Sequence, residues 1–129
     1  MKKILFLTVF AAVTATVPVY GHHSFAAYYF ADQSVSIEGF VEEFDFVNPH
    51  VWLHLQAADK EGKLQKVSVE WAPPNRLAQW GIKRDFLKPG DRVIVTGSPS
   101  RDGIGFKLQL KRLIRIADGW TWNGRGELR

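Results

Sequence analysis

The fold class is decided by residues 34–47, which read SVSIEGFVEEFDFV. The apolar residues of this stretch form two sets of opposite parity, Val35, Ile37 and Val41 in one and Phe40, Phe44 and Phe46 in the other. Because side chains alternate between the two faces of a strand, the buried face changes near Gly39-Phe40. A strand that changes its buried face at a glycine is typically bulged or sharply bent, as at the corner of a barrel. We therefore predict one long, bent strand here.

A hairpin follows this strand. The apolar residues that alternate on its two arms are Val51, Leu53 and Leu55 within residues 51–58, and Val67, Val69 and Trp71 within residues 64–71. A polar turn at residues 59–63 separates the arms. Regular alternation on both sides of a turn that contains glycine is typical of two paired antiparallel strands.

The remaining pattern is one short helix and two strands. Pro73-Pro74 ends the hairpin, and we expect Asn75 to cap a helix that carries Leu77 and Trp80 and ends at Gly81. A tight turn then leads into a strand around residues 93–95. The apolar residues of the last predicted strand share one parity apart from the interruption at Arg112, and are Phe106, Leu108, Leu110, Ile114 and Ile116.

This order of elements predicts an all-β fold, a small five-stranded Greek-key barrel of the OB type with one short helix between the third and fourth strands. A small β-sandwich is the alternative. A chain of 129 residues has room for one domain. We expect a signal peptide over residues 1–21, a histidine-containing lead-in over 22–33, the barrel over 34–118 and a tail with Trp and Arg over 119–129.

Residues 1–21 have the features of an export signal, since two lysines precede an apolar run over residues 4–13 and Pro18 ends it. We predict cleavage after Gly21, a periplasmic location and no stable membrane span in the mature chain. An uncleaved anchor is the alternative, although the run is short for a span of about 20 residues. Cleavage lowers the formal charge from +4 to +2, because Lys2 and Lys3 are the only charges lost. A nearly neutral exported domain is a poor nucleic-acid binder.

The lack of cysteine restricts the kinds of metal site and catalytic residue that this chain can form. The chain has no cysteine and its one methionine is Met1, which excludes disulfide scaffolds, zinc fingers, iron–sulfur sites and thiol catalysis. A mature chain without Met1 offers no soft ligand for Cu(I). There is also no nucleophile elbow, phosphate-binding glycine loop or metal-binding His-x-x-x-His helix, so the sequence favours a binding protein over an enzyme.

The four histidines occur in two places, His22-His23 and His50/His54. Cleavage after Gly21 would give His22 a free α-amine beside its imidazole, and both groups can bind one cation. Cleavage one residue earlier would start the chain with Gly-His-His, a square-planar nitrogen site suited to Cu(II) or Ni(II). Both choices predict one divalent transition metal, Cu(II) above others. A loose tail with exposed histidines is the alternative.

His50 and His54 would share one face of a strand, about 13 Å apart. Imidazole ligands lie near 2 Å from their ion, so these two cannot share one metal. We expect His50 to join His22 and His23, because Pro49 places it at the mouth of a strand. A hydrogen bond within its own loop is the alternative for His50.

Three further residues are candidate partners of a ligand ring. They are Asn48, His54 and Glu70. If the hairpin pairs as expected, Glu70 lies on the same face as Trp52 or His54 and could hold an imidazole in place. Solvent-facing positions are the alternative for His54 and Glu70.

Aromatic residues provide a second candidate surface. Trp120 and Trp122 lie among basic residues and, with Trp52, could stack on a sugar or a partner protein. The alternative is that the two C-terminal indoles cover one end of the barrel. Tyr28 and Tyr29 could act as axial metal ligands, although aromatic packing explains them better.

Five motifs occur in a fixed order along the chain: His22-His23-Ser24-Phe25, Asn48-Pro49-His50-Val51-Trp52, Pro74-Asn75-Arg76-Leu77, Trp80-Gly81 and Lys88-Pro89-Gly90-Asp91. With them, residues 21–118 resemble the small exported bacterial proteins grouped as domain of unknown function 6152. The resemblance implies a periplasmic, OB-like barrel and no assigned activity. It places the family's His-His pair and Asn-Pro-His triplet on His22, His23, Asn48 and His50. The tail over 119–129 departs from the family's short tail.

Three functions follow from these features. The first is a monomeric periplasmic module that binds Cu(II) through the new N-terminus, His22 or His23, and His50. The second is a structural or interaction module that binds a periplasmic protein, a glycan or another small ligand through the barrel face. The third is a copper-dependent oxidase built on a histidine brace, which the fold class alone does not support.

Overall fold

The computed structural model describes residues 25–124 and 127–128. The predicted signal peptide and the His22-His23 pair lie outside the described residues. The elements in chain order are α1 (Phe25–Tyr28), β1 (Val35–Asp45), β2 (Trp52–Ala58), β3 (Leu64–Glu70), α2 (Pro74–Gln79), β4 (Arg92–Pro99), β5 (Phe106–Arg115), β6 (Thr121–Trp122) and β7 (Glu127–Leu128). Within this part of the chain, no helix is long and apolar enough to cross a membrane.

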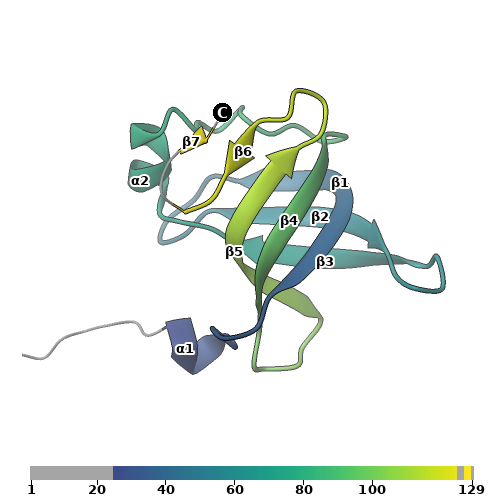
Figure 1. Cartoon of the computed structure of the whole chain (residues 1–129). Coiled ribbons are helices and arrows are strands. Elements are labelled where there is room, and N and C mark those ends of the chain that lie inside the picture. Colours follow the sequence, from purple (N-terminus) through teal and green to yellow (C-terminus); the bar gives the residue numbers. More distant parts are fainter. Residues whose placement is uncertain (1–24, 125–126, 129) are drawn as a thin grey trace, which may run out of the picture.

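Strands β1 to β5 form a closed barrel (Figure 1). The sheet order is β3-β2-β1-β4-β5, and a parallel pairing of β3 with β5 closes it. The short helix α2 lies between β3 and β4 in the chain. The predicted five-stranded OB-like barrel is thus confirmed, and the β-sandwich alternative is wrong because two separate sheets would not close in this way. Strands β6 and β7 continue the sheet beyond β5.

The long first strand bends as predicted, but its face change lies later than predicted. Residues Val35 to Phe40 pair with β4, and Phe40 to Asp45 pair with β2, so β1 changes partner at Phe40. The face change itself occurs at a β-bulge between Val41 and Glu43. Gly39 is needed for close packing, since a Cβ there would lie 2.7 Å from the Gln56 carbonyl oxygen. Phe40 remains 53% exposed because the bulge follows it.

The barrel interior is filled by the alternating residues of the hairpin and of β4 and β5. Its fully buried members include Val51, Leu53, Leu55, Val69, Val93, Val95 and Leu113. The prediction for the last strand is partly wrong, because Phe106 and Ile116 are exposed. A register shift opposite Thr96/Gly97 moves the inward position from the predicted parity to Leu113.

Helix α2 closes one end of the barrel and differs from the prediction at its start. Pro73 is the N-cap, and Asn75 lies inside the helix, so the predicted Asn75 cap is wrong. A proline at the start of a helix needs no side-chain cap for its missing N–H. The predicted end at Gly81 is confirmed, since Gly81 has φ +76° and the Ile82 N–H donates to the Leu77 carbonyl at 3.0 Å. Leu77 is fully buried.

Candidate functional site

A cavity of about 580 Å³ lies on one side of the barrel. It is bounded by α1, by the loop that precedes β2, by the end of β3 and by the loop between β4 and β5. The residues that line it are Phe25, Ala27, Tyr28, Tyr29, Pro49, His50, Trp52, Glu70, Ser100, Arg101, Asp102 and Lys107. Aromatic walls with a few convergent polar groups are typical of ligand sites.

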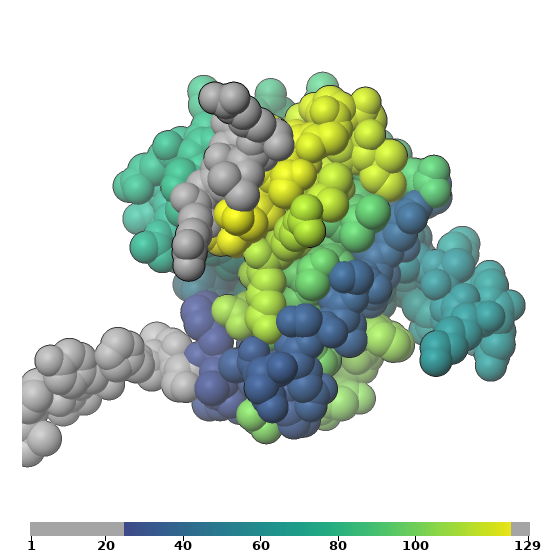
Figure 2. All heavy atoms as spheres, viewed as in Figure 1, coloured from purple at the N-terminus to yellow at the C-terminus, as the bar shows by residue number. Residues whose placement is uncertain are grey.

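The lead-in segment is anchored to the loop between β4 and β5. Tyr29 forms a β-bridge with Ser100, and the Arg101 N–H donates to the Tyr28 carbonyl at 2.8 Å. The Arg101 side chain donates through Nε to the Ala26 carbonyl at 2.9 Å and lies over the Phe30 ring at 4.3 Å. The early part of the chain therefore packs against this loop (Figures 1 and 2).

Glu70 holds two side chains at the base of the cavity. Its Oε2 accepts a hydrogen bond from the Tyr29 hydroxyl, and its Oε1 pairs with His50 Nδ1. The position of Glu70 follows from the register of the hairpin, in which Glu70 of β3 lies opposite Trp52 of β2. Burial, together with the hydrogen bond to Glu70 and its negative charge, raises the pKa of Tyr29 well above its ordinary value.

His50 is thereby fixed with its second ring nitrogen still available. In the described part of the chain Nδ1 has Glu70 as its partner, and Nε2 has no hydrogen-bond partner. A carboxylate on one nitrogen of an imidazole orients the ring and raises the basicity of the other nitrogen, as is usual for metal-binding histidines. The Phe25 ring lies 6.0 Å from the His50 ring, centroid to centroid.

The candidate residues near His50 and in the C-terminal tail differ in whether they reach the cavity. Asn48 is exposed and does not line the cavity, whereas Trp52 does. Trp122 is 4% exposed and packs on Trp71 at 5.1 Å, and Trp120 is half-buried against Phe86 at 4.6 Å. The two C-terminal indoles therefore pack on the molecule itself, and Trp122 offers almost no surface to a partner.

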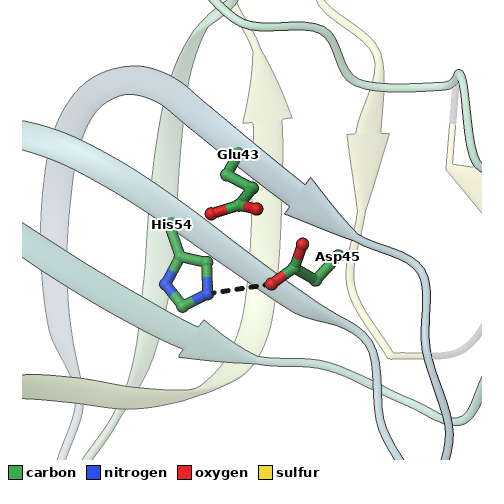
Figure 3. Close-up of side chains that lie close together, drawn as sticks. All are labelled: Glu43, Asp45 and His54. Atoms are coloured by element: carbon green, nitrogen blue, oxygen red, sulfur yellow. Dashed lines mark ion pairs between the residues drawn. The ribbon is translucent and has the colours of Figure 1, made fainter.

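His54 belongs to a different group of side chains from His50. Glu43, Asp45 and His54 offer one ligand atom each, and these atoms lie within 4.8 Å of one another (Figure 3). His54 Nε2 lies 3.4 Å from Asp45 Oδ2. Sequence reasoning missed both carboxylates, because only the register of β1 against β2 brings them to His54. The available signal was the alternation of Glu43 and Asp45 after the bend of β1.

The model of a family of unknown function, DUF6152, matches residues 11–109. The chain belongs to this family. The resemblance of its motifs to DUF6152 proteins is thus confirmed, and the match includes all the cavity-lining residues. A search of curated proteins gave no match.

Two solved structures resemble the fold of this DUF6152 protein. Both are crystal structures of mitochondrial single-stranded DNA binding proteins from S. cerevisiae, Rim1, one of them selenomethionine-labelled. The first has 13% identity and covers 65% of this chain and 93% of its own, with a TM-score of 0.49. The labelled form has 14% identity, covers 72% and 97%, and has the same TM-score of 0.49.

Proposed function

We propose that this DUF6152 protein is a periplasmic, monomeric metal-binding module rather than an enzyme. It binds one divalent transition metal, Cu(II) above others, through His50 and the histidines His22 and His23 of the mature N-terminus. The observation that carries the proposal is the pairing of His50 Nδ1 with Glu70 on a residue that lines the cavity, which leaves Nε2 without a hydrogen-bond partner among the described residues.

The reach of the chain supports the contribution of the N-terminal histidines. Phe25 lines the cavity and lies 6.0 Å from the His50 ring. His23 precedes Phe25 by two residues, so its Cα lies within about 7 Å of the Phe25 Cα by chain geometry. The anchoring of residues 26–30 on the Arg101 loop holds Phe25 beside the His50 ring. An imidazole at this position can therefore approach His50 Nε2.

The ligand set supports Cu(II). The site would contain imidazole nitrogens and the terminal amine released by cleavage after Gly21, with no sulfur donor. Nitrogen-rich sites of this kind suit Cu(II) and Ni(II), and Cu(II) binds more tightly in the Irving–Williams order. Glu70 would not be a ligand. Its role would be to orient the His50 ring.

The experiment measures Cu(II) affinity by competition with a chelator, on protein recovered from the periplasm after expression with its own signal. Native mass spectrometry of the same sample gives the first residue and the bound metal. We expect the His22→Ala/His23→Ala variant to lose at least about 100-fold in affinity and His50→Ala at least about tenfold, each tenfold being about 1.4 kcal/mol. Unchanged affinity in the double variant would overturn the proposal. Lys107→Ala, on the same cavity wall, is the control and keeps the wild-type affinity.

A second candidate function is suggested by the place of the cavity. In OB folds, the face of the second and third strands and the loops after the first and fourth strands bind oligonucleotides and oligosaccharides. The cavity lies there, with Trp52 and the 65%-exposed Tyr28 on its walls. The low net charge of the predicted mature chain favours a glycan over a nucleic acid. A glycan that shifts the amide signals of the cavity-lining residues in the wild type, but shifts none of them in a Trp52→Ala variant, would support this function.

A further inference from the structure

We propose that the outer face of the barrel carries a second cation site, formed by Glu43, Asp45 and His54, which takes Zn(II). This site is separate from the cavity and uses none of its residues. The proposal goes beyond the Cu(II)-binding function and does not depend on it.

The distances between the donor atoms suit a single ion. The three donor atoms lie within 4.8 Å of one another. His54 Nε2 and Asp45 Oδ2 are 3.4 Å apart, which is longer than a good hydrogen bond. Two ligands at about 2.0–2.2 Å from a tetrahedral Zn(II) are themselves about 3.3–3.6 Å apart. The pair is therefore spaced as two ligands of one ion.

The bulge in β1 creates this arrangement. Phe40 and Val41 oppose Gln56 and Leu55, so regular pairing would place Glu42 opposite His54. The bulge instead places Glu43 opposite His54 and Asp45 opposite Trp52. Both carboxylates then share the outer face with His54 (Figure 3). Bulges recur next to functional sites because they re-aim side chains in this way.

The His54 ring is held from the opposite side. Its Nδ1 pairs with Ser68 Oγ at 2.9 Å, and its face stacks on Trp52 with 6.4 Å between centroids and 7° between planes. The ring therefore presents Nε2 to Asp45. A ring with one nitrogen held by a hydrogen bond and the other directed at a common point is the usual state of a histidine ligand.

The charges around the site form an independent argument for a cation. Among the described residues, no lysine or arginine pairs with Glu43 or Asp45. The adjacent Glu42, by contrast, lies 3.6 Å from Lys66 Nζ. Two carboxylates therefore converge on one imidazole without a lysine or arginine partner in the described ranges, and a divalent ion would neutralise them.

The mixture of donors selects the class of ion. One imidazole and two carboxylates are harder ligands than the nitrogen set of the cavity, and no thiolate is present. Zn(II) accepts this mixture in sites that have three protein ligands and keep a fourth position for water. Glu43 is exposed, so solvent can reach that position.

The test uses the His22→Ala/His23→Ala chain, so that the N-terminal donors do not compete, with Zn(II) followed by calorimetry. We expect one Zn(II) to bind and to shift the amide signals of residues 43–45 and 52–54. Asp45→Asn and His54→Ala should each weaken binding by at least about tenfold. Glu42→Gln is the matched control and keeps the affinity of the background, whereas Glu43→Gln lowers it.

Two results would overturn the second site. One is the absence of Zn(II) binding by the background chain, and the other is an affinity that Asp45→Asn and His54→Ala leave unchanged. Circular dichroism of each variant confirms that the barrel is intact. The outcome is independent of the cavity, because failure of the Cu(II) proposal appears as unchanged Cu(II) affinity in His22→Ala/His23→Ala.

Discussion

His50, in the loop before β2, and His54, within β2, are four residues apart in the sequence, yet their surroundings are opposite. His50 has a carboxylate behind its ring, since Nδ1 pairs with Glu70, and its Nε2 has no partner in the described part of the chain. His54 has a neutral hydroxyl behind its ring, since Nδ1 pairs with Ser68, and the carboxylates of Glu43 and Asp45 lie in front.

The difference shows how a strand and the loop before it can serve two kinds of ligand. The ring of His50 is oriented by the carboxylate of Glu70, and its further ligands would be nitrogen donors from outside the barrel, which suits Cu(II). The ring of His54 has only a weak partner behind it and finds its carboxylates within the sheet, which suits a harder ion. The two positions are separated by Trp52, which lines the cavity and stacks on His54.

The largest effect should come from the core residue of the strand beside the two histidines. Leu53 lies between His50 and His54 in the sequence, and its side chain is fully buried in the barrel interior. Leu53→Ala should lower the free energy of unfolding by about 2–5 kcal/mol, because it removes buried methyl groups and leaves a cavity. Urea denaturation measures this loss. The exposed Leu64→Ala, on β3, is the control and should change stability by less than about 0.5 kcal/mol. Equal losses in both variants would show that Leu53 does not anchor the strand.

The next effect separates the two sites from one another. Glu70→Gln keeps the shape of the side chain and removes the charge behind His50. We expect it to weaken Cu(II) binding by about 10- to 100-fold, as is typical when the partner of a ligand ring is lost. Zn(II) binding at His54 should not change. Glu38→Gln, whose carboxylate pairs with Arg92 away from both sites, is the control. Equal Cu(II) affinity in wild type and Glu70→Gln would contradict the role given to Glu70.

A smaller effect is expected behind the other ring. Ser68→Ala removes the neutral hydrogen bond to His54 Nδ1, which has a donor–acceptor distance of 2.9 Å. A bond of this kind contributes about 0.5–1.5 kcal/mol, so Zn(II) affinity should fall by about 2- to 12-fold while Cu(II) affinity stays the same. Ser36→Ala, which loses a hydroxyl contact to Thr96 on another pair of strands, is the matched control. A loss of Zn(II) affinity in Ser68→Ala that exceeds the loss of Cu(II) affinity in Glu70→Gln would contradict the view that His50 has the stronger partner behind its ring.

The part of this arrangement that could be predicted is the part set by local pattern. Alternation along residues 51–58 and 64–71 predicted the hairpin, and its register placed Glu70 beside Trp52. That register in turn gave Glu70 an imidazole partner. Local alternation suffices here because a short turn fixes which residues face each other.

The parts that could not be predicted depend on strands that are distant in the sequence. The bulge between Val41 and Glu43 is decided by where β1 leaves β4 and joins β2, so Phe40 was wrongly placed inside. The same cause hid the Glu43–His54 pairing. In the last strand, the register shifts opposite Gly97, where the Gln109 carbonyl oxygen would lie only 2.4 Å from a Cβ, and no pattern of apolar residues reveals this close approach.

The smallest expected effect comes from the titration of a side chain in the His50 region and involves no metal. On the cavity side the Tyr29 hydroxyl donates to the carboxylate of Glu70, and burial and Glu70 raise the pKa of Tyr29. The folded chain therefore keeps the phenol proton at a pH where the unfolded chain releases it, with an ordinary pKa of about 10. The stability that Tyr29 contributes is present in full below that pH and is lost as the pH rises above it.

Tyr29→Phe removes this dependence. Between about pH 9 and pH 10.5, wild type should lose about 0.8 kcal/mol of unfolding free energy through Tyr29, and the variant should not. Urea denaturation at the two pH values gives the difference, in which the titration of lysines common to both chains cancels. Tyr28→Phe changes a residue that is 65% exposed, keeps Tyr29 intact and should behave as wild type. An equal loss in wild type and Tyr29→Phe would mean that the Tyr29–Glu70 contact does not hold the phenol proton in the folded chain.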